Sequence, residues 1–258
     1  MAFPVVFQLG PFLMPAYTFC MLAAVLVGVG IVYYEARRRG RLTEPTLRVA
    51  FAALLGGVFG AKLSMLVFLG PATFWRLLPT IPRHGAAFTG ALIGGYVTAV
   101  LVERRLRITG CTGDLLAPAL PLGQAIGRLG NYLAGDAYGL PTGLPWGMTM
   151  AGAARHPVQF YEAALDLVLF AIIWRWRHRL SRDGDLFRLY VVGYALIRFP
   201  LEFLRYQPTP RDFLGLTLVQ WLCLASIAGF GYQLFLSSRG ASCICDLLPG
   251  ARRRQAVS

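Results

Sequence analysis

Seven long apolar runs follow one another along this chain and leave it few ways to fold. Each is close to the roughly 20 residues that a helix needs to cross a hydrocarbon core. Hydrophobic residues make up 56% of the chain and charged residues 14%, which leaves too little polar surface for one soluble globule. The sequence therefore predicts an all-α, polytopic integral membrane protein with about seven transmembrane helices. The runs are 16–36, 47–69, 86–102, 115–134, 157–175, 187–205 and 213–237.

We expect the runs to form a single transmembrane helical domain over residues 1–240. Residues 241–258 follow it with three consecutive arginines, and we expect them to form a basic cytoplasmic tail that is mobile on anionic lipid. The apolar composition excludes intrinsic disorder, and five cysteines do not make a disulfide scaffold.

Arginine is divided unevenly between the connections, and Lys62 is the only lysine. The first, third and fifth connections and the C-terminal tail together carry 17 arginines. The positive-inside rule then places the N-terminus outside and the C-terminus in the cytoplasm. This asymmetry accounts for the net charge of +13 without nucleic acid, because no basic stripe with interleaved aromatics is present. The other connections carry five arginines: Arg76, Arg83, Arg155, Arg205 and Arg211.

Polar residues inside or near the ends of the runs gather at the outer face in this orientation. Ionisable groups at membrane depth are costly and point to function, although snorkelling or a helix-packing pair is the alternative, above all for Lys62 and Asp166. Arg198 and Glu202 are four residues apart, so a structural pair is a further alternative there. The set is Tyr17, Thr89, Arg128, Asn131, His156, Gln159, Tyr161, Glu162, Arg198, Glu202 and Arg205.

The Gly-rich stretch from Gly127 to Gly139 carries the most information. Its glycines permit close backbone approach and positive φ where a helix ends, and small-residue helix packing is the alternative reason for them. Arg128 presents a planar fork of donors that suits a phosphate, and Asn131 lies on nearly the same face. Arg128 and Arg198, with no acidic excess to neutralise both, favour an anionic ligand such as a phospholipid headgroup.

Several segments, in order along the chain, resemble the motifs of the prolipoprotein diacylglyceryl transferase family. The resemblance runs from about Tyr17 to Gln220 and implies a seven-span enzyme of the bacterial inner membrane, with its active site towards the outer leaflet. The matching segments are Gly90–Gly95, Asp114–Ala119, Gly127–Gly139, His156–Glu162 and Tyr194–Arg205.

What the resemblance implies is a transferase that moves the diacylglyceryl group of phosphatidylglycerol onto the lipobox cysteine thiol of a prolipoprotein. A thioether forms and glycerol phosphate leaves. Fixed positive charge must stabilise the departing phosphate, and the thiol must become a thiolate. Phosphatidylglycerol, the lipobox peptide and membrane lipid are the implied partners, with no nucleic acid. No cofactor is required, and the sequence shows no ligand cluster that would hold a metal.

The resemblance also carries residue roles onto matching positions. The implied catalytic residues are Arg128, Arg198, Asp136, Thr89 and Tyr17. The implied substrate-binding residues are Asn131, Gly139, Tyr194, Glu202 and His156.

Two segments depart from the family pattern. Thr89-Gly90-Ala91-Leu92 stands where the family usually has His-Gly-Gly-Leu, and Ala134-Gly135-Asp136 stands where it has Asn-Gly-Glu. Threonine does not act as a base near neutral pH, so the sequence identifies no thiol base. Two alternatives follow: a divergent paralogue that uses the same phospholipid donor with a different acceptor, and a catalytically silent lipid-binding membrane protein.

Overall fold

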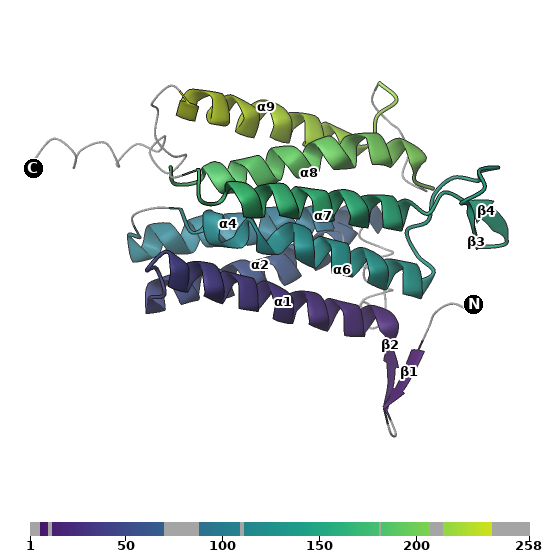
Figure 1. Cartoon of the computed structure of the whole chain (residues 1–258), viewed down its shortest axis with the longest axis horizontal. Coiled ribbons are helices and arrows are strands. Elements are labelled where there is room, and N and C mark those ends of the chain that lie inside the picture. Colours follow the sequence, from purple (N-terminus) through teal and green to yellow (C-terminus); the bar gives the residue numbers. More distant parts are fainter. Residues whose placement is uncertain are drawn as a thin grey trace, which may run out of the picture. The chain divides into compact units, whose positions relative to one another are not determined.

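The computed structural model describes residues 6–9, 12–69, 88–108, 111–180, 182–206 and 214–238. Within these ranges the chain is mainly helical (Figure 1), as the apolar runs predict, and every run overlaps one long helix. The C-terminal tail lies outside the described residues. The long helices are α1 (Ala16–Arg38), α2 (Glu44–Leu69), α4 (Phe88–Leu106), α6 (Ala119–Ala134), α7 (Val158–Trp176), α8 (Asp185–Leu204) and α9 (Leu218–Ser238), and the single turn α5 (Gly113–Leu116) precedes α6.

Three of the described helices are long and apolar enough to cross a membrane by length and composition: α1, residues Glu44–Ser64 of α2, and residues Leu218–Ser237 of α9. Their outer surfaces carry large apolar side chains, and Leu26 on α1 is 72% exposed. Such a surface is suited to lipid rather than water. The structure therefore supports a helical membrane protein, while the count of seven spans stays a prediction.

Two short antiparallel hairpins, which the sequence did not predict, accompany the helices. Strand β1 (Val6–Leu9) pairs with β2 (Phe12–Pro15), and β3 (Met148–Met150) pairs with β4 (Ala153–Arg155). The second hairpin turns at Ala151 and Gly152, whose φ angles are 49° and 78°. A two-residue turn with positive φ at both central residues matches the twist of the paired strands.

The chain divides into two compact units, and each is described by itself. One unit contains residues 36–113, and the other contains residues 1–35 and 114–258. In the smaller unit, α2 packs on α4 where glycines face glycines. A Cβ added to Gly94 would lie 2.9 Å from the Cα of Gly60, and one added to Gly90 would lie 2.5 Å from the carbonyl oxygen of Gly60. Small residues at this spacing let helix backbones approach closely.

In the larger unit, α6 packs on α7, α7 on α8, and α8 on α9. Helix α1 approaches α6 along its glycine face, where a Cβ added to Gly130 would lie 2.9 Å from the Cβ of Cys20. Small-residue packing, the alternative explanation for these glycines, therefore applies to Gly130. Gly135 ends α6 with φ of 72°, and Asp136 N–H donates to the carbonyl of Asn131 over 3.0 Å. This is the helix ending that the Gly-rich stretch predicts.

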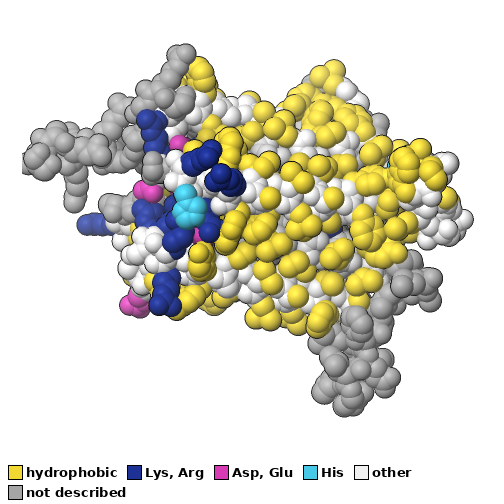
Figure 2. All heavy atoms as spheres, viewed as in Figure 1, with side chains coloured by type: hydrophobic (Ala, Val, Ile, Leu, Met, Phe, Trp, Pro, Cys, Tyr) yellow, Lys and Arg dark blue, Asp and Glu magenta, His cyan; other side chains and the backbone are white. Residues whose placement is uncertain are grey.

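The α7–α8 connection and the start of α8 form the basic end of the larger unit. Figure 2 shows basic side chains gathered around the α7–α8 connection, while apolar side chains cover the helix flanks. Asp114 stabilises the start of α8, because its carboxylate accepts hydrogen bonds from the N–H groups of Gly184 (2.8 Å) and Phe187 (3.0 Å). Its buried charge therefore has a structural role. The arginines of this segment are Arg175, Arg177, Arg179, Arg182 and Arg188.

Candidate active site

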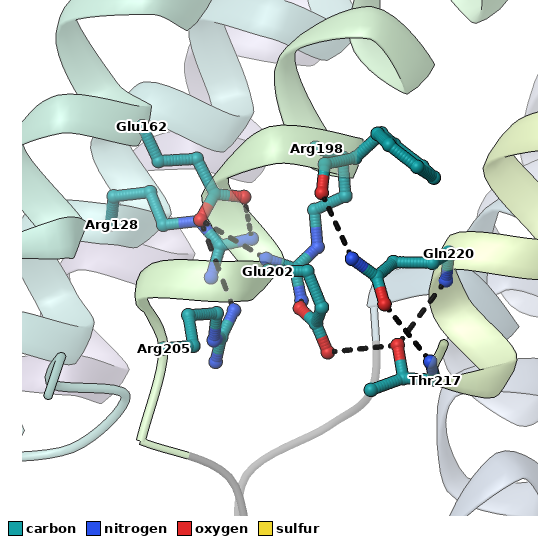
Figure 3. Close-up of polar contacts among 8 residues, drawn as sticks. Arg128, Glu162, Arg198, Glu202, Arg205, Thr217 and Gln220 are labelled. Atoms are coloured by element: carbon teal, nitrogen blue, oxygen red, sulfur yellow. Dashed lines mark hydrogen bonds and ion pairs between the residues drawn. The ribbon is translucent and has the colours of Figure 1, made fainter. Parts of the chain in front are cut away.

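A buried ion-pair cluster joins three helices of the larger unit at the end opposite the α7–α8 connection (Figures 1 and 3). Glu162 of α7 lies at its centre. One carboxylate oxygen of Glu162 lies 2.5 Å from a guanidinium nitrogen of Arg128 on α6, and the other lies 3.8 Å from both Arg198 and Arg205. A second carboxylate, Glu202 of α8, lies 2.5 Å from Arg198. We call these five residues the arginine cluster.

The start of α9 closes one side of the arginine cluster. Thr217 N–H donates to the side-chain oxygen of Gln220 over 2.9 Å, and Gln220 N–H donates to the Thr217 hydroxyl over 3.3 Å. This reciprocal pair is a capping box. The Thr217 hydroxyl also donates to Glu202 over 3.4 Å, and the Gln220 amide donates to the Phe199 carbonyl over 3.4 Å. The local helix start thereby holds α8 and the carboxylate of Glu202 in place.

The arginine cluster keeps donors available for an anion. The guanidinium nitrogens Nη1 of Arg198 and Nε of Arg205 are buried and have no hydrogen-bond partner in the part of the chain that the structure describes. Buried donors without acceptors are costly, and acceptor oxygens of a phosphate would satisfy them with charge-assisted hydrogen bonds. The side chains of Arg128, Arg198 and Arg205 are only 11%, 7% and 14% exposed. Such shielding strengthens an electrostatic interaction relative to water.

Two predicted tyrosines lie beside the arginine cluster. The Tyr17 ring packs against Gly130, and Tyr17 interacts electrostatically with Arg128 and Asp136. The Tyr194 ring stacks on Tyr190 with centroids 6.2 Å apart, and Tyr194 also interacts with Arg128. Within the larger unit, the structure thus brings together Tyr17, Arg128, Tyr194, Arg198 and Glu202, while their predicted roles in one site stay predictions.

Gly139 and His156 lie in a loop network that adjoins the arginine cluster. Gly139 N–H donates to the His156 carbonyl over 3.0 Å, and a Cβ at Gly139 would lie 2.6 Å from that carbonyl oxygen. Gly139 also forms a β-bridge with Arg205. Close backbone packing is therefore sufficient reason for a glycine here. The predicted substrate contacts of Gly139 and His156 stay predictions.

Arg155 ties the same loop to the end of α8. Its guanidinium carbon lies 4.8 Å from the Tyr138 ring centroid and 4.7 Å from that of Tyr206, a favourable cation–π arrangement. Tyr206 N–H donates to the Tyr138 carbonyl over 3.1 Å, and Leu140 N–H donates to the Leu204 carbonyl over 2.8 Å. These bonds fix the loop next to Arg205.

Three predicted site residues make no ion pair with the arginine cluster within the described ranges. Asp136 is exposed, and its carboxylate accepts from Ala137 N–H over 2.6 Å. Asn131 is half-buried one turn beyond Arg128 on α6. Thr89 lies at the start of α4 in the smaller unit, so its predicted catalytic role stays a prediction.

Asp166 lies one helical turn further along α7 than Glu162. Its side chain is fully buried, and neither carboxylate oxygen has a hydrogen-bond partner among the described residues. Without such a partner, an ionised carboxylate in a dry interior costs several kcal/mol. Asp166 therefore favours its neutral form and adds no charge to the arginine cluster. Lys62 lies in the smaller unit.

Sequence reasoning placed Glu162 and Arg205 at the outer face but gave neither a role in the site, and it missed Thr217 and Gln220. The pattern Thr-x-x-Gln before an apolar run was the available signal for the last two, because it is a capping-box sequence. No local signal identifies Glu162 as the central carboxylate, since its partners come from other helices. Within the described ranges, no group of three His, Cys, Asp or Glu residues could hold a metal ion.

The fold and the arginine cluster together define a class of protein: a mainly helical membrane protein with a buried cluster of arginines and carboxylates between helices. Residues 4–236 match the family described as prolipoprotein diacylglyceryl transferase. Since this match covers nearly the whole chain, the protein belongs to the prolipoprotein diacylglyceryl transferase family.

Curated relatives agree with this assignment. A protein of Bordetella parapertussis named phosphatidylglycerol–prolipoprotein diacylglyceryl transferase is 35% identical over 255 residues, which cover 90% of this chain and 94% of the relative. Proteins of the same name from Aromatoleum aromaticum and Coxiella burnetii are 33% and 34% identical, and the alignments cover 92% and 85% of this chain and 95% and 87% of the relatives.

Proposed function

We propose that this protein transfers the diacylglyceryl group of phosphatidylglycerol to the lipobox cysteine thiol of a prolipoprotein. The observation that carries the proposal is the arginine cluster in a chain of this family: three buried guanidinium groups, of which those of Arg198 and Arg205 each keep a donor without a hydrogen-bond partner among the described residues. The names of the curated relatives supply the two substrates.

The arginine cluster suits the chemistry of the leaving group. In the proposed step the cysteine sulfur bonds to the diacylglyceryl carbon, and the bond from that carbon to the phosphate oxygen breaks. The electron pair of the broken bond goes to glycerol phosphate, and the thiol proton is released. Arg128, Arg198 and Arg205 are placed to donate to the phosphate oxygens as negative charge develops. Fixed donors in a shielded site lower this barrier without reorganising in the transition state.

The proposal also gives roles to the remaining predicted site residues. Tyr17 and Tyr194 contact the headgroup beside Arg128, while Asn131 and Asp136 face it from the end of α6. Gly139 and His156 shape the loop that covers the substrate, and Glu202 holds Arg198. For Thr89, which lies in the smaller unit, the family resemblance supports a role with the acceptor thiol. No cofactor is needed.

We further propose that the seven long helices cross the bacterial inner membrane with the N-terminus outside and the C-terminus in the cytoplasm. Residues 1–240 then form one transmembrane domain. In the larger unit, the arginine cluster lies at the opposite helix ends from the α7–α8 connection with its arginines. Because cytoplasmic connections carry the basic excess, this polarity supports an active site towards the outer leaflet.

Removal of the guanidinium group of Arg128 or of Arg198 tests the proposal. The purified protein is reconstituted with phosphatidylglycerol and a synthetic lipobox peptide, and peptide mass and released glycerol phosphate are followed together. We expect the parent protein to add one diacylglyceryl group for each glycerol phosphate released. Arg128→Ala and Arg198→Ala should each lower transfer by about 100-fold or more, as losing one charge-stabilising donor does in other enzymes. Full activity in both folded variants would contradict the assigned roles.

The threonine at position 89, where the family usually has histidine, favours a second candidate function. In this function the phospholipid donor is the same and the acceptor differs. This candidate predicts glycerol phosphate release without modification of the lipobox peptide. Thr89→His should then raise peptide modification, because an imidazole can accept a thiol proton near neutral pH and a threonine hydroxyl cannot. If the parent protein modifies the peptide and Thr89→His gives no gain, the second candidate is rejected.

A further inference from the structure

The central position of Glu162 poses a chemical question, because a carboxylate occupies the place where a phosphate would bind. Glu162 is 1% exposed and lies within 4 Å of all three arginines of the cluster. Glu202, by contrast, pairs with Arg198 alone and is held by Thr217. An anion bound to these three arginines would therefore lie beside Glu162, a like charge paired with the same guanidinium groups.

We infer that Glu162 is an internal counter-ion that competes with the bound phosphate and thereby promotes release of glycerol phosphate. The inference rests on the proposed function and adds a role for a residue that the reaction itself does not consume. Glu162 is a positioning residue, since it acts through the arginines and not on the reacting atoms.

The charges of the arginine cluster support this role. Three guanidinium groups against two carboxylates leave one positive charge. Asp166 is buried without a hydrogen-bond partner in the part of the chain that the structure describes, which favours its neutral form. A phosphodiester headgroup carries one negative charge and neutralises the cluster. The phosphomonoester product carries up to two, because its second pKa is about 6. Glu162 therefore matches the cluster to the substrate and leaves the product with an excess negative charge.

Without Glu162 the balance reverses. Three arginines against Glu202 alone would leave two positive charges, which suit the product dianion better than the substrate monoanion. Like charges placed together across a binding site cost several kcal/mol, and each 1.4 kcal/mol changes affinity tenfold. Glu162→Gln keeps the shape of the side chain, removes its charge, and should tighten product binding by at least about tenfold.

The first test measures equilibrium binding of glycerol phosphate to the full chain in nanodiscs of phosphatidylcholine, which supply no competing anionic lipid. We expect Glu162→Gln to bind at least about tenfold more tightly than the parent protein, and Glu162→Asp, which keeps the charge, to resemble the parent. Glu35→Gln is the matched control, because Glu35 is also buried and paired with an arginine, Arg177, 3.4 Å away. It should leave glycerol phosphate binding unchanged. Equal or weaker binding by folded Glu162→Gln would overturn the inference.

A kinetic test separates release from chemistry. With phosphatidylglycerol and lipobox peptide, Glu162→Gln should complete a first turnover and then slow, giving a burst of modified peptide, whereas the parent protein should show no burst. Added glycerol phosphate should inhibit the variant more strongly than the parent. A purely structural role for Glu162 predicts that the first and later turnovers of Glu162→Gln slow equally, without a burst, and that result would also overturn the inference.

If removing the Glu162 carboxylate destabilises the fold, the melting temperature serves as the readout. Uncompensated buried arginines are costly, and a bound anion would replace the missing charge. Glycerol phosphate should therefore raise the melting temperature of Glu162→Gln more than that of the parent, and an equal or smaller rise counts against the inference. A parent protein that binds glycerol phosphate but does not modify the peptide would contradict the proposed function alone, since the binding comparison still decides the role of Glu162.

Discussion

At the end of α8, Arg205 reaches the same carboxylate oxygen of Glu162 as Arg198 does, at 3.8 Å in each case. It is also joined to Gly139 by a β-bridge. Arg205 therefore links the loop that contains Gly139 to the buried arginine cluster. By charge and position, Arg205 therefore belongs with Arg128 and Arg198.

Arg205→Gln should lower kcat/KM for diacylglyceryl transfer by about 100-fold, because one of three fixed donors to the developing phosphate charge is lost. Arg182→Gln is the control, since Arg182 is exposed in the α7–α8 connection at the opposite helix ends of the larger unit. Steady-state transfer to the lipobox peptide checks both variants. Comparable rates for Arg205→Gln and the control would remove Arg205 from the site.

At the scale of elements, different interactions pack the helices within each of the two units. Helices α2 and α4 meet through glycine backbones, where van der Waals contact between close helices provides the association. In the larger unit, polar groups join the elements: Asp114 caps α8, and the capping box of Thr217 and Gln220 joins α9 to α8.

Gly94→Ala should destabilise the pair of α2 and α4, because the added Cβ would lie 2.9 Å from the Cα of Gly60, where the backbone cannot yield. Overpacking of this kind costs about 1–3 kcal/mol, which a fall in melting temperature in detergent would report. Gly30→Ala is the matched control, since a Cβ at Gly30 meets nothing within 4 Å and alanine favours a helix. If Gly94→Ala is as stable as Gly30→Ala, close glycine contacts do not explain the packing of α2 on α4.

At the scale of the whole molecule, the proposed orientation places the two ends of the helices of the larger unit on opposite sides of the membrane. In a cysteine-free background, Leu214→Cys should react with a membrane-impermeant thiol reagent from outside the inner membrane, because Leu214 is 79% exposed beyond the end of α8. Arg182→Cys should react after the membrane is permeabilised. The opposite labelling pattern would invert the proposed topology and place the active site on the cytoplasmic side.

Much of the fold could be predicted from the sequence because the signals are local. Each apolar run overlaps a long helix, and Gly135 ends α6 with positive φ as the Gly-rich stretch predicts. The hairpin of β3 and β4 was missed, since strands of three residues carry too little periodicity to detect. The site was predicted in part: Arg128 and Arg198 were assigned roles, while Glu162 and Arg205 were noted only as polar residues at the outer face.

The sequence by itself determined the helical membrane architecture, the family and the presence of arginines within long apolar runs, because apolar length, arginine distribution and motif order are all read along the chain. Only the tertiary structure decided that Glu162 binds Arg128 and lies near both Arg198 and Arg205. Those contacts depend on the rotation and axial register of three helices against one another. Periodicity defines the face of one helix but not its register against the next, so the central carboxylate of the site emerged only from the packed molecule.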